Sequence, residues 1–148
     1  MSCGHGARRN HGFISRRWTW WNLRRKPVVC AAALAVIETI EEEKLVDRAA
    51  HIGTILSESL NALKAKHSVI GEVRGRGAMM AIELVHPGTK NPNPEAMAKV
   101  IKYCQSKGVL ILTAGTYGNV IRFLPPLVIT DELLKDALGV LAEGFASL

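Results

Sequence analysis

The sequence predicts an α+β fold in which helices pack on one face of a small sheet. Two long segments with helical apolar periodicity come first. Two pairs of short strand-like segments follow, with one helical segment between the pairs and another after them. The expected order is therefore α-α-β-β-α-β-β-α. The 148 residues suffice for one domain with a modest core, and we do not expect a large two-domain enzyme.

The first two segments are expected to form long helices. Pro27 suits the first helical turn, where its missing N–H has no partner to lose. The helix that it opens carries a broad apolar stripe, expected to pack against a neighbour, of Ala31, Leu34, Ala35, Ile37 and Leu45. A second helix is predicted over about Leu45–Lys66, with a core face of Leu45, Ala49, Ile52, Ile55, Leu56, Leu60 and Leu63.

Three glycines organise the first strand pair. Gly71, Gly75 and Gly77 divide the chain into a short strand, a turn and a second strand over residues 78–85. This spacing is not a dinucleotide-binding fingerprint, because a strand follows the glycines where that motif needs a helix.

The remaining elements have clear boundary signals. Pro94 opens a helix predicted over residues 95–107, which Gly108 ends, with an inner face of Met97, Val100, Ile101 and Cys104. Strands are expected at residues 109–114 and 120–124. Thr130 or Asp131 caps the last helix, whose predicted apolar stripe is Leu133, Leu134, Leu138, Leu141 and Phe145.

Composition and charge exclude several functions. Hydrophobic residues make up 48% and charged residues 22%, which is typical of a soluble globular protein. We expect no membrane span, because no apolar run reaches the ~18–20 residues that a span needs. The start of the chain lacks the apolar h-region of a secretory signal, so a cytoplasmic location is the default expectation. The net charge of +6 comes from residues 1–27, which hold seven basic residues and no acid. Residues 28–148 are nearly neutral, so their charge does not indicate a nucleic-acid or membrane partner.

Arg122 is the one candidate binding residue. It lies in the apolar strand segment at residues 120–124, where a charged guanidinium must be paired or must face a cleft. Its planar fork matches a carboxylate, so an acid group is the natural ligand. The alternative is a structural ion pair, for which Glu83 is the candidate partner, and spacing alone favours this alternative. Tyr117 and Asn119 could line the same cleft or simply satisfy the turn.

Other reactive side chains form no recognisable constellation. His51, His67 and His86 are isolated and are expected on surfaces or at helix ends. The three cysteines show no CxxC spacing, so neither a disulfide framework nor a zinc site is indicated. We expect no catalytic group and no metal ligand in this chain.

Three strings identify a family resemblance: VVCAAALAVIETIEEEKLVDRA, GEVRGRGAMMAIELV and GTYGNVIRFLPPLVITDELL. They resemble the C-terminal portion of class III pyridoxal-phosphate aminotransferases, nearest to the 4-aminobutyrate aminotransferases. The resemblance implies the small C-terminal domain of a fold-type I homodimer, with a long N-terminal helical segment. It also implies that Arg122 binds the carboxylate of an amino acid or 2-oxo acid substrate, which reverses the preference for a structural ion pair.

The same resemblance limits what this chain can do. In the family the lysine that holds the aldehyde cofactor as a Schiff base, and the residues that bind the cofactor phosphate, lie upstream of this region. The resemblance therefore implies that this chain, as a fragment, neither binds pyridoxal phosphate nor catalyses transamination alone.

Residues 1–27 are interpreted separately. The family carries GGLGGTYAGNP where this chain has RRWTWWNLRRKP. Reading the codons of residues 18–26 from their second base turns every tryptophan codon into a glycine codon and permits the family string. We interpret residues 1–27 as a non-homologous, out-of-frame and disordered segment, joined by one lost base to the true frame at residues 28–148.

Two alternatives assume that the whole chain is a genuine protein. In one, it is a truncated non-enzymatic interaction protein whose basic Trp/Arg-rich N-terminus binds nucleic acid or an anionic membrane. In the other, it is a subunit fragment that pairs with a separately encoded cofactor domain.

Overall fold

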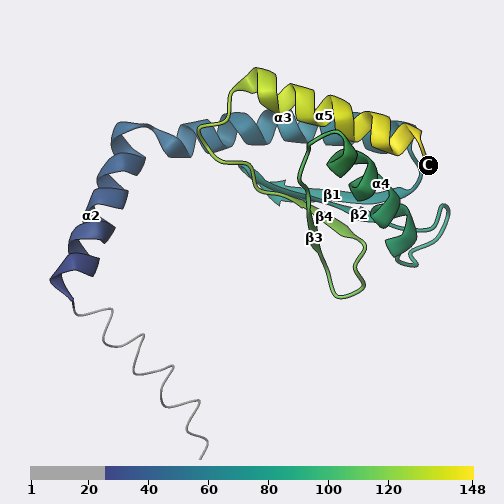
Figure 1. The fold of residues 1–148 in the computed structure, drawn as a ribbon, viewed down its shortest axis with the longest axis horizontal. Coiled ribbons are helices and arrows are strands. Elements are labelled where there is room, and N and C mark those ends of the chain that lie inside the picture. Colours follow the sequence, from purple (N-terminus) through teal and green to yellow (C-terminus); the bar gives the residue numbers. More distant parts are fainter. Residues whose placement is uncertain (1–25) are drawn as a thin grey trace, which may run out of the picture. The chain divides into compact units, whose positions relative to one another are not determined.

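The computed structural model describes residues 26–148, which form eight elements in the predicted order (Figure 1). These elements, in chain order, are α2 (Pro27–Glu42), α3 (Leu45–Lys66), β1 (Ile70–Arg76), β2 (Met79–Leu84), α4 (Pro94–Ser106), β3 (Leu112–Ala114), β4 (Val120–Phe123) and α5 (Asp131–Ala146). The out-of-frame interpretation of residues 1–27 and its nucleic-acid or membrane alternative concern a segment that lies, apart from its last two residues, outside the described part of the chain.

The first compact unit ends at Lys44 and contains α2. Pro27 stands in the first turn of α2, as predicted, and none of the helix's residues is buried. Its predicted apolar stripe therefore contributes nothing to the core of the described chain, and Leu34 and Ile37 are 59% and 52% exposed. Across residues 26–148, none of the helices has the length and apolar character that crossing a membrane requires.

The second unit, residues 45–148, is built on a four-stranded antiparallel sheet with strand order β1-β2-β4-β3. The edge strand β3 spans only three residues, although a strand was predicted over residues 109–114. Its partner explains the difference, because β4 pairs with β3 only through Val120–Arg122. Leu124 is followed by Pro125 and Pro126, which have no N–H group to continue the ladder.

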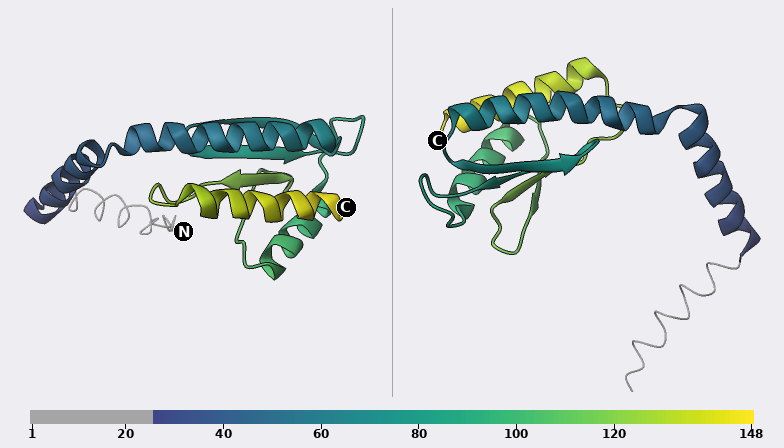
Figure 2. Two further views of the ribbon diagram at one scale, coloured as in Figure 1. Left: turned by 90° about the horizontal axis from the view of Figure 1, so that it is seen from above. Right: turned by 180° about the vertical axis from the view of Figure 1, so that it is seen from behind.

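The helices of this unit, α3, α4 and α5, cover one face of the sheet, as predicted. Views from different sides show α3 and α5 running alongside each other over the strands (Figure 2). Alternation along β2 and β4 turns Met80, Ile82, Leu84 and Ile121 toward the helices. A single core cluster joins these strand residues to the buried faces of the helices, namely Ile52, Leu56, Leu60, Leu63, Met97, Val100, Ile101, Cys104, Leu134, Leu138, Leu141 and Phe145.

In α3, α4 and α5, all but one of the predicted core positions are confirmed. The predicted inner faces of α3 and α4 are buried or half-buried throughout. In α5, Leu133 is 60% exposed, whereas its neighbour Leu134 is buried. Thr130 is the N-cap, and its hydroxyl oxygen accepts a hydrogen bond from the Leu133 N–H at 3.3 Å. The first turn of α5 is thus oriented by its cap and by Leu134, and Leu133 faces solvent.

A polar clamp fastens the start of α5 to α3. Arg48 donates to one Asp131 carboxylate oxygen at 2.7 Å, and His51 Nε2 lies 2.8 Å from the other. Arg48 also donates to the carbonyl oxygens of Leu127 and Ile129, in the segment that leads into α5. The pKa of Asp131 is lowered, first by the His51 hydrogen bond and then by that from Arg48. His51 is on the surface, as predicted, but its part in this clamp was not.

Candidate functional site

The face of the sheet that the helices leave free is called here the open sheet face, and two neighbouring rows of residues define it. The first row runs through Arg74, Ala81, Arg122 and Leu112, one residue from each strand. The second row runs through Glu72, Glu83, Val120 and Ala114. The first row alternates with the buried positions and so lies opposite the core, whereas in the second row Val120 is itself buried. This face therefore combines charged residues with rigid, paired backbone.

Arg122 stands in the middle of β4 with its side chain exposed. Ile121 beside it is fully buried in the core, so alternation turns Arg122 to the open sheet face. Among residues 26–148, no acidic group lies within ion-pairing distance of the Arg122 guanidinium, and no hydrogen bond from it is found. The strand thus presents a guanidinium whose donors are available to a ligand.

The structural ion pair between Arg122 and Glu83 is wrong, because Glu83 has other partners. Arg74 Nη1 donates to Glu83 Oε2 at 2.7 Å and to Glu72 Oε2 at 2.9 Å. The pKa of Glu83 is lowered, first by this hydrogen bond from Arg74 and then by one from Asn119. The pKa of Arg74 is raised, chiefly by its hydrogen bond to Glu83. Glu83 is therefore a carboxylate at neutral pH, and its cationic partner is Arg74 rather than Arg122.

Asn119 has a structural role. Its side chain is 1% exposed and donates to the Leu84 carbonyl oxygen at 2.9 Å and to Glu83 Oε1 at 3.3 Å. The Leu84 N–H in turn donates to the Asn119 carbonyl oxygen at 2.8 Å, which fixes where β4 begins against β2. Tyr117, which sequence analysis placed beside it, is 71% exposed. Of the two open interpretations, satisfaction of the turn is the one found for Asn119.

A pocket of about 240 Å³ adjoins Arg122 where β3 and β4 meet α5. Its walls are apolar, with Pro125, Pro126, Leu134 and Leu138 among them, and Arg122 is the only lining residue with a charged side chain. Arg122 thus lies at the edge of an apolar pocket.

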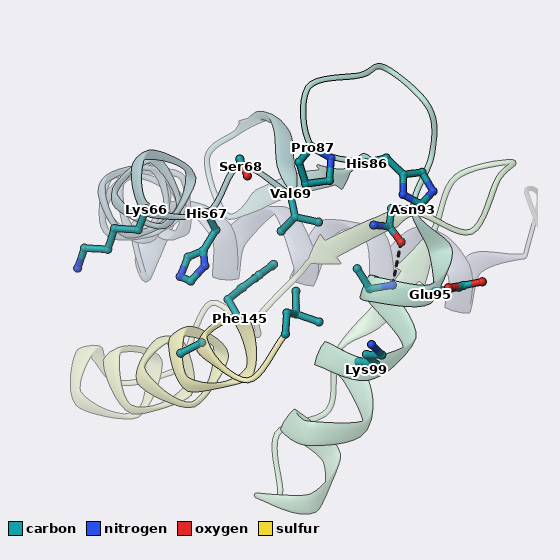
Figure 3. A pocket seen from close by; sticks show the side chains of 13 residues that line it. Lys66, His67, Ser68, Val69, His86, Pro87, Asn93, Glu95, Lys99 and Phe145 are labelled. Atoms are coloured by element: carbon teal, nitrogen blue, oxygen red, sulfur yellow. Dashed lines mark hydrogen bonds between the residues drawn. The ribbon is translucent and has the colours of Figure 1, made fainter.

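A second pocket, of about 590 Å³, lies where the end of α3, the start of α4 and the end of α5 meet (Figure 3). Asn93 caps α4 there by accepting a hydrogen bond from the Ala96 N–H at 3.0 Å, drawn dashed in the figure. His67 ends α3 and lies against Phe145, with ring centroids 5.6 Å apart, which agrees with its predicted place at a helix end. Among the described residues, no group of histidine, cysteine and acidic side chains is arranged to hold a metal ion.

Lys66 and Lys99 line the second pocket, and a lysine is the residue type that anchors an aldehyde cofactor. Every lysine in residues 26–148 is exposed, these two included. A Schiff-base lysine needs an enclosed site that holds the cofactor ring and desolvates the amine. The exposed position of the described lysines differs from such a site.

Comparisons with known proteins agree on one family. The model of the family described as "Aminotransferase class-III" matches residues 23–145. The 4-aminobutyrate aminotransferase of Mycobacterium leprae is 51% identical over 117 residues, which are 79% of this chain and 26% of the relative. The 5-aminovalerate aminotransferase DavT of Pseudomonas putida is 46% identical over 122 residues, which are 82% of this chain and 29% of the relative.

Solved structures give the same result. An amine transaminase from an uncultivated Pseudomonas species, in its pyridoxal-phosphate-bound form, superimposes with a TM-score of 0.70 at 35% identity. The match covers 82% of this chain and 28% of the transaminase. This chain thus spans between a quarter and a third of the length of the relatives that it matches.

Proposed function

The chain belongs to the class III aminotransferases, and on that premise we propose that residues 28–148 are the C-terminal domain of an aminotransferase in which Arg122 binds a substrate carboxylate. The available guanidinium of Arg122 on the open sheet face carries this proposal. Its acidic neighbour Glu83 is already held by Arg74, so an incoming carboxylate meets a cation that no described residue neutralises.

Arg122 is well placed to orient a carboxylate as well as to attract it. Ladder pairing on both sides holds the β4 backbone, with Arg122 opposite Ala81 of β2 and Leu112 of β3. A guanidinium binds a carboxylate through two parallel N–H···O bonds, which fix the direction of the ligand as well as its position. Neither neighbour in the row carries a charge, so the substrate faces no competing group directly beside Arg122.

The substrate class follows from what the relatives share. Their names give 4-aminobutyrate and 5-aminovalerate as substrates, which differ in length but both carry a terminal carboxylate. Arg122 recognises that common group, with a 2-oxo acid such as 2-oxoglutarate as the amino acceptor. The choice of donor length would lie with residues outside this chain.

Class III aminotransferases use pyridoxal phosphate, which supplies the electron sink for amino transfer when bound. Because all described lysines are exposed, we propose that this chain binds no cofactor alone and does not catalyse transamination in isolation. The remainder of the enzyme would hold the cofactor, and we expect a homodimer, as is general in the family. The role of the described residues is then to bind and orient the substrate.

A chimera tests this function. Residues 28–148 would replace the matching segment of the Mycobacterium leprae enzyme, and transamination of 4-aminobutyrate with 2-oxoglutarate would be measured. We expect activity in the chimera, and a fall of about 100-fold or more in kcat/KM on Arg122→Gln, since removing a charged bidentate partner costs about 3 kcal/mol. Arg76→Gln, an exposed arginine near the end of β1, is the matched control. An active chimera that is unaffected by Arg122→Gln would contradict the proposal.

A further inference from the structure

Glu83 on β2 has one arginine on each neighbouring strand, and both arginines are offset from it by the same number of residues. Ala81 of β2 pairs with Arg74 on β1 and with Arg122 on β4. Glu83, two residues along β2, therefore has one arginine diagonal to it on either neighbouring strand. Diagonal neighbours in a sheet have Cβ atoms about 7–8 Å apart, which arginine and glutamate side chains span easily. By position alone, Glu83 could pair with either.

The contacts show which partner Glu83 has. Its Oε2 accepts from Arg74 at 2.7 Å, and its Oε1 accepts from Asn119 at 3.3 Å. Asn119 is buried and bonded to Leu84, so it holds the Glu83 carboxylate from a fixed point. Glu72 shares the same Arg74 nitrogen at 2.9 Å and keeps that guanidinium over β1 and β2. Both Glu83 carboxylate oxygens thus accept hydrogen bonds from other residues, and neither is bonded to Arg122.

We propose that Arg74 is a positioning residue that holds Glu83 away from Arg122 and so keeps the Arg122 guanidinium available to the substrate carboxylate. This inference rests on the proposed function of Arg122. Without Arg74, the Glu83 carboxylate would be an intramolecular competitor, always present at high effective concentration beside the binding group. Beside Arg122 its negative charge would also repel an incoming substrate carboxylate, whereas the ion pair with Arg74 now holds that carboxylate toward β1.

The first test needs no ligand. The Glu83 carboxyl signal would be followed by ¹³C NMR against pH in the full chain and in the Arg74→Gln, Arg122→Gln and Arg74→Gln/Arg122→Gln variants. In Arg74→Gln we expect the pKa of Glu83 to stay below its ordinary value, because Arg122 takes over as its partner. In the double variant the pKa should rise well above that of either single variant. Equal pKa values in Arg74→Gln and in the double variant would overturn the proposal.

The second test measures competition, with glutarate as the probe. Glutarate affinity would be read from the shift of the Arg122 Nε–Hε signal. Arg74→Gln should weaken binding by about two- to fivefold, the range of a solvent-exposed ion pair. Arg74→Gln/Glu83→Gln should restore wild-type affinity, because the competitor is gone. Failure of that rescue, or no loss in Arg74→Gln, would overturn the proposal.

Two controls separate the possible causes. Arg74→Lys keeps a cation beside Glu83 and should bind glutarate within about twofold of the wild type, and backbone amide spectra report whether each variant is folded. Arg76→Gln removes a nearby exposed arginine that does not pair with Glu83, so it should change neither the pKa of Glu83 nor the affinity for glutarate. If the wild-type chain fails to bind glutarate, the proposed role of Arg122 fails, whereas the Glu83 titration still decides whether Arg74 holds Glu83 off Arg122.

Discussion

The two faces of the sheet are made from the same strands but differ in burial and in charge. On the inner face Ile82 and Ile121 are fully buried, and their side chains serve the core. On the open sheet face, one residue away along each strand, Glu83 and Arg122 carry charges at the surface. Stability should therefore depend on the inner face, and ligand binding on the outer one. Three substitutions test this separation, and a fourth tests the clamp that joins α5 to α3.

The largest effect is expected on the inner face. Ile82→Ala should lower the free energy of unfolding by about 2–5 kcal/mol, because it removes buried methyl groups and leaves a cavity between the sheet and α3. Denaturant unfolding of the chain measures this loss. Met79→Ala, in the same strand but 56% exposed, is the control and should cost less than about 1 kcal/mol. Similar losses in the free energy of unfolding for Ile82→Ala and Met79→Ala would contradict the claim that the inner face determines stability.

Asn119 joins the two faces and should give an intermediate effect. Asn119→Ala should destabilise the chain by about 0.5–1.5 kcal/mol, since the Leu84 carbonyl oxygen loses its side-chain donor but keeps the hydrogen bond from the Asn93 N–H. The same unfolding measurement applies. Tyr117→Ala, two residues away and exposed, should stay within about 0.5 kcal/mol of the wild type.

The Asp131 clamp should make stability depend on acid. The folded-state pKa of Asp131 is lowered by His51 and Arg48, so its contribution is present above the unfolded pKa of about 3.9 and is lost as pH falls through the folded value. The difference in Tm between the wild type and Asp131→Asn should be larger at pH 6 than at pH 2.5. A difference that does not change with pH would show that the clamp is not electrostatic.

The smallest effect on stability is expected at Arg122. Arg122→Gln should leave the free energy of unfolding within about 0.5 kcal/mol of the wild type, because the side chain is exposed and no described residue pairs with it. A loss above 1 kcal/mol in denaturant unfolding would indicate a structural role for Arg122 and would contradict the separation of the two faces.

Local signals in the sequence predicted most of the fold. Helical periodicity predicted the bounds of α3, and the cap at Thr130 and the proline that begins α4 placed two more helices. Periodicity failed for α2 and Leu133, because a pattern shows which side chains are apolar but not what lies against them. The length of β3 was not predicted, because it depends on how far its partner β4 extends before the two prolines that follow it.

The candidate site was predictable only in part. Arg122 stood out because it is a charge in an apolar strand. The partner of Glu83 could not be predicted, because the sheet order places Glu83 between two arginines and the choice depends on Glu72 and Asn119. The Arg48–Asp131 clamp joins residues 83 positions apart, and neither lies in a recognisable motif.

The most direct test of the central claim is a titration of the wild-type chain with glutarate and, separately, with the neutral glutaramide, monitoring all arginine Nε–Hε signals. If Arg122 is the carboxylate-binding group, its signal should move saturably with glutarate and stay unmoved with glutaramide, while Arg76 responds to neither. Equal shifts of both arginines, or no shift of Arg122, would contradict the claim.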